Sequence, residues 1–438
     1  MSATTALVVG TIIGTGVFLK TARMAQAVGT PKLVLLAWVA AGLLSLAGAL
    51  SYAELGAMLP DAGGEYVYLR AAYGTVPAFL FGWMRLTVGS AGSIASFGAA
   101  FAKFLAVIMP LTSSAAQRAV GVGLILLFTA VNCLRVTIGG RVQAALTLAK
   151  VLAIASIAIG VFFFSHTATW EHLRAPVGAA AWCGFPAFGA AMLSALWAFD
   201  GWNNMPMAAG EVRDPGRNIP WALLGGMAIV LAVYGLLNLA YCYALPIEEI
   251  AASSSTLHDA ALPVAFKAAN TFLPRFGSQL VAIAALLSTI GVLNGSILTG
   301  ARITYAMARD GLFPARFAQL GEHSAVPVPS IILQGAWASV LVLSATFDQL
   351  TDCVIFAGMI FYAATTTAVF VLRKKRPDAP RPYRTLGYPV VPMLFVLVAL
   401  WLVINTVSTN PKESMAGLGL IALGLPVYYW QRRAKPAM

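Results

Sequence analysis

The hydrophobic pattern along the chain consists of long apolar runs separated by short polar stretches. A transmembrane helix needs roughly 20 apolar residues. On that criterion we expect twelve membrane-spanning helices in an all-α polytopic membrane protein, forming a single domain over 1–438. The expected spans are 3–19, 33–59, 77–109, 116–134, 141–165, 182–210, 219–245, 276–308, 329–346, 349–372, 391–408 and 414–431.

Two of these spans are interrupted by residues that suit an unwound backbone. Gly10 to Gly16 brings three glycines into the first span, and Phe199 to Pro206 brings an acid, a glycine and a proline into the sixth. At membrane depth, non-helical backbone is tolerated only where it is buried in protein or lines a cavity. A matched pair of such breaks is typical of the substrate site of a transporter built from inverted repeats.

The span lengths support such a repeat. The third and eighth spans are long and hold matching places, so spans 1–5 and 6–10 form two related units. We expect repeat one at 1–165, repeat two at 182–372, and two appended helices at 391–431. The basic residues of the loops, Arg373 to Arg376 among them, predict that both termini are cytoplasmic.

Composition excludes other classes of protein. The chain is 59% hydrophobic and 10% charged, whereas soluble domains carry about 25% charged residues. The net charge of +12 comes from short loops and forms no basic face for nucleic acid. No CxxC or histidine pairing accompanies the four cysteines, so we expect no metal, no cofactor and no disulfide framework; they are Cys133, Cys183, Cys242 and Cys353.

The first break suits an anionic group. Gly10, Gly14 and Gly16 let a ligand approach the backbone, and unwinding frees N–H groups at the positive end of the following half-helix. Close helix packing through small residues is the alternative, since Gly10 and Gly14 also fit a GxxxG pattern.

The sixth and seventh spans carry further candidates, each with two interpretations. Asp200 can pair with a substrate ammonium or a cationic side chain, or it can cap its own broken helix. Asn203 can form hydrogen bonds with the substrate or with backbone groups that the break leaves unpaired. Trp197 fits an aromatic gate or core packing. Tyr234 offers a hydroxyl at suitable depth or is an ordinary buried tyrosine.

Lys150 lies about ten positions into the fifth span, too deep to reach the interface comfortably. Its expected partners are carbonyls of the first break and a hydroxyl of Ser288 or Thr289. There the ammonium can stand in for a sodium ion, release a proton during the cycle, or have a structural role. Four residues of the third span are pocket candidates: Ser90, Gly92, Ser93 and Ser96.

The connecting segments carry polar groups too. The external segment from Pro246 to Arg275 can be a lid over an outer vestibule or a solvated connector. Glu54, Glu65 and Arg70, near the inner end of the second span, are expected to form an intracellular gate or structural ion pairs.

These motifs resemble the amino acid–polyamine–organocation (APC) superfamily, and within it bacterial members of the L-type amino acid transporter family. The matching stretches cover nearly the whole chain: Gly10 to Phe18, Tyr52 to Met58, Gly63 to Leu69, Trp197 to Asn203, and Asn294 to Gly311.

The resemblance implies a five-plus-five inverted-repeat fold, leucine-transporter-like, with alternating access. It places the substrate carboxylate on Ile12, Ile13, Gly14, Thr15 and Gly16, and the amino group on carbonyls around Trp197, Ala198, Phe199, Asp200 and Gly201. It further implies that Trp197 is the aromatic gate, that Tyr234 takes part in substrate handling, and that Lys150 occupies a former sodium site.

We therefore expect a sodium-independent L-amino acid exchanger of neutral or broad range in a bacterial inner membrane, and not an enzyme. A proton-coupled symporter, a cationic amino acid or polyamine antiporter, and a transport-dead sensor are the alternatives. No filter or ring of charges indicates a channel. The loop at 110–117 has no cysteine, so no disulfide-linked heavy chain is expected.

Overall fold

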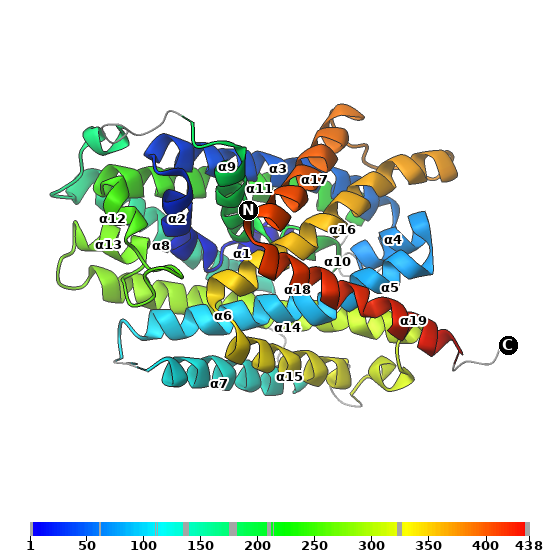
Figure 1. Cartoon of the computed structure of the whole chain (residues 1–438). Helices are drawn as coiled ribbons and strands as arrows, with labels where there is room; N and C mark the ends of the chain where they lie inside the picture. Colours follow the sequence, from blue (N-terminus) through cyan, green and yellow to red (C-terminus); the bar gives the residue numbers. More distant parts are fainter. Residues whose placement is uncertain are drawn as a thin grey trace.

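The computed structural model describes residues 3–60, 63–109, 111, 113–134, 140–174, 182–207, 212, 214–321 and 326–433. Within these ranges the regular structure is helical, without strands (Figure 1). The first half contains α1 Ala3–Ile12, α2 Gly16–Val28, α3 Pro31–Met58, α4 Glu65–Tyr73, α5 Thr75–Met84, η1 Arg85–Gly89, α6 Ser90–Leu105, α7 Ser114–Cys133, α8 Gly140–Phe164, η2 Trp170–Leu173, α9 Phe185–Phe199 and α10 Asn204–Met207.

The second half contains α11 Pro215–Ala244, α12 Ile247–Ala251, α13 Val264–Asn270, α14 Gly277–Arg309, η4 Ala315–Ala318, α15 Val328–Ser344, α16 Phe347–Lys375, α17 Val390–Thr409, α18 Pro411–Ala422 and α19 Gly424–Arg433. Among the described residues, eight helices are long and apolar enough to cross a membrane, and the bent pair of α1 and α2 raises this to nine. The protein is therefore a polytopic membrane protein, as the hydropathy predicts.

Most expected boundaries lie within a few residues of the helices, but three segments differ. In the first span the helix continues through Gly10 and Thr11, so the unwound part is only 13–15. The third span is α5 and α6 joined by the π-helical η1, a wider turn often found at functional sites. The last expected span is two helices, α18 and α19. The end of the expected sixth span, 208–210, lies outside the described residues.

The helices pack as two bodies. In one, α1 and α3 pack against α11, and α2 packs against α9; in the other, α6 packs against α14, and α7 and α15 pack against α6 and each other. Figure 1 shows α7 and α15 side by side along one edge of the molecule. α16 touches both bodies through α6, α3 and α9, so the two broken helices face α6 and α14 across the interior.

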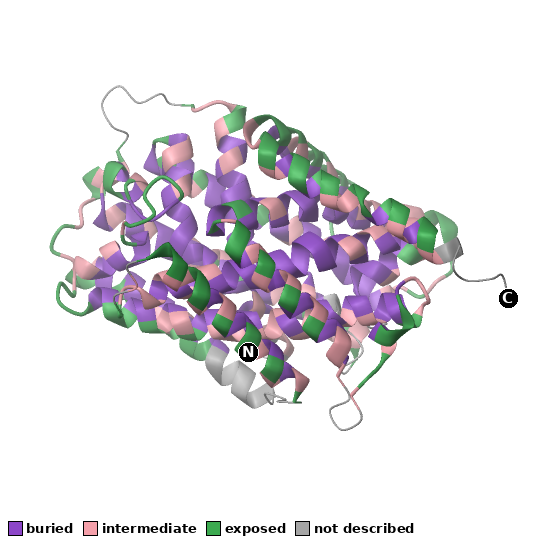
Figure 2. Ribbon diagram, turned by 60° about the horizontal axis from the view of Figure 1, so that its bottom comes forward, coloured by how far each residue is buried: buried purple, intermediate pink, exposed green. Residues whose placement is uncertain are grey.

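Side-chain exposure follows the membrane environment. Buried residues fill the centre, while exposed residues cover the outer faces of the helices (Figure 2). Many of the exposed side chains are large and apolar, such as Leu127 on α7 and Leu397 and Ile404 on α17. Such a surface is costly in water and favourable in lipid.

Candidate substrate site

The two helix breaks lie against each other. α1 ends at Ile12 and α2 begins at Gly16, while α9 ends at Phe199 and α10 begins at Asn204. A Cβ on Gly16 would lie 2.6 Å from Ala198 Cα, and a Cβ on Gly201 would lie 2.7 Å from the Thr11 carbonyl oxygen. Gly201 also has φ +117°, a conformation that favours glycine. Both glycines are therefore required for the close approach of the breaks.

Tyr234 on α11 joins the two breaks. Its hydroxyl lies 3.2 Å from the Ile12 carbonyl oxygen and 3.1 Å from the Ala198 carbonyl oxygen. Thr11 adds a second link, since its hydroxyl lies 3.3 Å from the Gly201 carbonyl oxygen. Tyr234 is fully buried and acts on the backbone of the breaks, which positions them relative to each other.

A small cavity of about 20 Å³ lies where the breaks meet. That volume holds about one water molecule, so binding of a larger solute requires the walls to move apart. The residues that line it come from both breaks and from α6 and α14: Thr11, Ile12, Gly14, Thr15, Gly16, Phe97, Trp197, Asp200 and Val292.

One wall of the cavity is the N-terminus of α2. The first N–H groups of a helix have no partner within it, and Thr15 at the N-cap makes no side-chain capping bond. The Thr15 hydroxyl is buried without a hydrogen-bond partner among the described residues. Unpaired donors at the positive end of a helix suit a carboxylate.

Another part of the lining comes from the second break. Asp200 follows the last residue of α9, and its Oδ1 accepts a hydrogen bond of 2.7 Å from Tyr362 of α16. Trp197 lies one turn earlier, and its ring packs against Phe97 at 5.6 Å and against Phe347 at 6.2 Å between centroids. A carboxylate and an aromatic ring therefore share this side of the cavity.

Lys150 reaches the first break from α8. Its Nζ lies 3.3 Å from the Gly10 carbonyl oxygen and 3.4 Å from the Ile13 carbonyl oxygen. The Ser288 hydroxyl donates to the same Ile13 oxygen at 3.2 Å. Thr289 instead bonds within its own helix, to the Ala285 carbonyl oxygen. Of the two expected hydroxyls, Ser288 is the one that meets the break.

Several sequence candidates lie behind the lining. Ile13, Ala198, Phe199, Gly201, Asn203 and Tyr234 are next to the cavity but do not line it. Asn203 donates to the Tyr362 hydroxyl at 2.9 Å. The candidates of the third span do not line the cavity either. The hydroxyls of Ser93 and Ser96 donate hydrogen bonds to carbonyl oxygens of the same span, and Phe97 is the residue of this span that lines the cavity. Phe97 and Val292 escaped prediction because apolar residues in a span also fit core packing.

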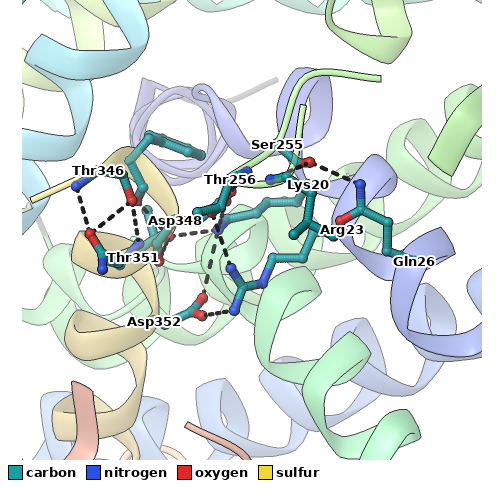
Figure 3. Close-up of polar contacts among 12 residues, drawn as sticks. Lys20, Arg23, Gln26, Ser255, Thr256, Thr346, Asp348, Thr351 and Asp352 are labelled. Carbon is teal, nitrogen blue, oxygen red and sulfur yellow. Dashed lines mark hydrogen bonds and ion pairs between the residues drawn. The ribbon is translucent and has the colours of Figure 1, made fainter. Parts of the chain in front are cut away.

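Charged residues close the side of the site that we expect to face outward, which is called the outer side below (Figure 3). Lys20 of α2 is fully buried; its Nζ lies 2.8 Å from Asp348 Oδ1 and 3.7 Å from Asp352 Oδ1 on α16. Arg23 Nη2 lies 2.6 Å from Asp352 Oδ2. The Lys20 ammonium is also 4.9 Å from the centroid of the Phe347 ring, the ring that packs on Trp197.

The external segment packs on this closure. Thr256 donates to Asp348 Oδ2 through its backbone N–H at 3.0 Å and its hydroxyl at 2.8 Å. Gln26 of α2 donates to the Ala251 carbonyl oxygen and the Ser255 hydroxyl. Figure 3 shows the contact between Gln26 and Ser255. The segment covers the outer end of α2, which favours the interpretation as a lid.

On the opposite side, which we expect to face the cytoplasm and call the inner side, the described residues form separate ion pairs. Both carboxylate oxygens of Glu54 on α3 accept from Arg373 of α16, at 2.9 and 2.7 Å. Arg70 of α4 pairs with Asp310, which follows α14. Because ion pairs of the described residues lie on both sides of a small cavity, we interpret the structure as an occluded arrangement.

Helices broken around a central cavity, with ion pairs on both sides of it, are typical of a membrane transporter. The chain belongs to the amino acid permease family, which matches residues 1–425.

Relatives align over almost the whole chain. It is 32% identical to the serine/threonine exchanger SteT of Bacillus subtilis, over 98% of this chain and 95% of the relative. It is 32% identical to the human b(0,+)-type amino acid transporter 1, over 97% of this chain and 85% of the relative. It is 30% identical to the human large neutral amino acids transporter small subunit 2, over 98% and 80%.

Proposed function

We propose that this permease is a sodium-independent exchanger of L-amino acids that works by alternating access. The observation that carries this proposal is the position of Lys150. Its ammonium meets the Gly10 and Ile13 carbonyl oxygens together with the Ser288 hydroxyl. Carbonyl and hydroxyl oxygens are hard ligands for a cation, and a fixed ammonium supplies that charge without a metal ion.

The substrate backbone fits the two breaks. Its carboxylate lies at the N-terminus of α2, on the N–H groups of Gly14 to Gly16, and its ammonium lies toward Asp200 and the carbonyl end of α9. Trp197 closes over it from the outer side. Relatives named as exchangers or transporters of amino acids, at about one third identity over nearly the full chain, support the same substrate class.

The finer architecture is part of this proposal. We infer twelve spans, with repeats at 1–165 and 182–372 and two added helices at 391–431, in a bacterial inner membrane with both termini cytoplasmic. The shorter apolar helices α9 and α15 supply two of the remaining spans, and we assign the last span to α18 and α19 together. We expect the chain to work without a disulfide-linked heavy chain, because residues 110–117 include no cysteine.

Proteoliposome uptake tests the function. Labelled amino acids are presented to vesicles that are empty or preloaded with unlabelled amino acid, at symmetric pH, with and without sodium. Uptake that needs preloading and ignores sodium supports the proposal. Equal uptake into empty vesicles would replace exchange by facilitated diffusion, and sodium stimulation would refute the role of Lys150.

The same vesicles test a second candidate, exchange of cationic amino acids or polyamines. Asp200 favours it, because this carboxylate lines the cavity and has a neutral phenol as its hydrogen-bond donor. If arginine competes more strongly than leucine, the substrates are cationic. The reverse order would assign Asp200 to the substrate ammonium alone.

A further inference from the structure

A second buried carboxylate lies on the inner side of Asp200. Glu65 is the first residue of α4 and is fully buried, although α4 lies outside the helices that span the membrane. The two residues before it, Gly63 and Gly64, have φ of +126° and +52°. These left-handed conformations favour glycine and turn the chain so that the glutamate enters the interior.

The Glu65 carboxyl is only half satisfied. Its Oε1 accepts a hydrogen bond of 2.6 Å from the Tyr52 hydroxyl of α3. Its Oε2 is buried without a hydrogen bond of good geometry among the described residues; the Asn203 side chain is the polar group that faces the carboxyl. By contrast, both oxygens of the buried Glu54 are held by Arg373 and Thr385. A carboxylate buried with one bare oxygen is costly in its charged form.

The charges around Glu65 do not balance. Asp200 faces it from the break between α9 and α10, Arg85 from η1, and the phenols of Tyr52 and Tyr362 from α3 and α16. Arg85 is the one cation in this group, and it forms no ion pair with a described carboxylate; its Nη2 donates to Asn204 at 3.4 Å. Two carboxylates facing one guanidinium leave one excess negative charge in the interior, which a proton removes.

We propose that Glu65 is a proton-binding site linked to the substrate cavity through Asp200; the link rests on the proposed exchange of amino acids. In the occluded arrangement the two carboxyls share one proton. A substrate ammonium at Asp200 keeps that carboxyl ionised, so the proton resides on Glu65. When the inner side opens, water hydrates the Glu65 carboxyl, its O–H bond breaks, and the proton passes to water on the cytoplasmic side.

The sign of the pH dependence follows. Burial raises the pKa of the Glu65 carboxyl to about 7. Below that pH the proton is bound, and the charges of Glu65, Asp200 and Arg85 sum to zero in the occluded arrangement. Above it, occlusion must enclose an unpaired charge, so exchange slows as the pH rises, by at most about tenfold per pH unit for a single proton.

The experiment measures amino acid exchange in proteoliposomes at equal internal and external pH, from about 6 to about 8, one unit on either side of this pKa. The wild-type rate is expected to fall several-fold across the range. Glu65→Gln removes this titrating group, so its profile is expected to be clearly flatter than that of the wild type. Glu54→Gln is the matched control: it also neutralises a buried inner glutamate, and its profile is expected to keep the wild-type slope.

Two further measurements separate the outcomes. Tyr52→Phe deletes the hydrogen bond that favours the ionised carboxylate, so the fall in rate is expected at higher pH. Infrared spectroscopy of the purified protein reads the protonated carboxyl directly, as a C=O band that Glu65→Gln removes, and this needs no transport. Wild-type vesicles without exchange would refute the proposed function, whereas equal slopes in wild type and Glu65→Gln, or a band unchanged by the substitution, would refute the proton site.

Discussion

Removing the Lys20 charge is expected to open the outer side of the protein. Lys20→Met keeps the length of the side chain but deletes the ammonium that lies 2.8 Å from Asp348 Oδ1. Lys20 is fully buried, and Asp348 is 5% exposed. Truncating one partner of a buried ion pair costs about 3–5 kcal/mol, because the other charge is left without compensation.

The structure places Lys20→Met at the lower end of that range. Asp348 retains two hydrogen bonds from Thr256, and Asp352 retains Arg23 at 2.6 Å. A penalty of about 3 kcal/mol corresponds to roughly a 100-fold change in an equilibrium constant. Opening hydrates the carboxylate and removes the penalty, so the equilibrium shifts toward the outward-open arrangement by that factor.

The assay is thiol labelling from outside intact cells. A Thr15→Cys probe is built in a chain without the four native cysteines, after that chain has been shown to exchange amino acids. Thr15 lines the cavity and is 1% exposed, so a membrane-impermeant maleimide labels it only after outward opening. Lys20→Met is expected to speed labelling by one to two orders of magnitude, within the roughly 100-fold shift of the equilibrium.

A second lysine near the outer end provides the control. Lys103 pairs with Asp259 at 2.6 Å, but the Asp259 side chain is 67% exposed. Exposed pairs contribute about 0–1 kcal/mol, so Lys103→Met should change labelling less than about fivefold. Adding Asp348→Asn to Lys20→Met should restore slow labelling, since no uncompensated charge remains. Equal labelling in Lys20→Met and Lys103→Met would show that the buried pair does not hold the outer side closed.

Three other substitutions test the site itself. Gly16→Ala drives a Cβ into the backbone of Ala198 and should lower exchange at least tenfold, whereas Gly123→Ala, with open space around it, should exchange like wild type. Lys150→Met leaves the Gly10 and Ile13 carbonyls without their ammonium, so exchange should fall about tenfold or more at unchanged protein yield. Asp200→Asn removes the one carboxylate among the described residues that line the cavity, so competition by arginine should weaken about tenfold relative to leucine. If the ratio of arginine to leucine competition is the same in the wild type and in Asp200→Asn, Asp200 does not select substrates by charge.

The sequence predicts the helices and their breaks because those signals are local. An apolar run marks α3 at 33–59 against the observed Pro31–Met58, and glycines mark the meeting point of the breaks. Lys150 was predictable for the same reason, since a charge in the middle of an apolar run needs polar partners. The rotation of α14 about its axis decides which hydroxyl meets the Ile13 carbonyl oxygen beside Lys150. In the structure it is the hydroxyl of Ser288 and not that of Thr289.

The sequence predicts ion pairs at Glu54 and Arg70, but it does not predict their partners, and it does not predict the outer closure, because both depend on long-range packing. Lys20 and Asp348 are 328 positions apart, and in the sequence each resembles an ordinary charge near the end of a span. Glu65 was expected to take part in the same gate or ion pairs, but it forms no ion pair with a described residue. Only the packing of α4 against α5 and α16 reveals that Glu65 is buried.

α16 connects the three polar layers of the protein. It has 29 residues, or about 43 Å at about 1.5 Å per residue. Asp348 at its outer end meets α2, Tyr362 in its middle meets Asp200, and Arg373 at its inner end meets Glu54. Outward opening must break the first contact, and inward opening must break the third. Because the phenol lies between them, α16 can keep its contact with the substrate break while either end separates. Losing both ends at once would add the cost of two broken buried pairs, so we expect the two sides of the site to open alternately.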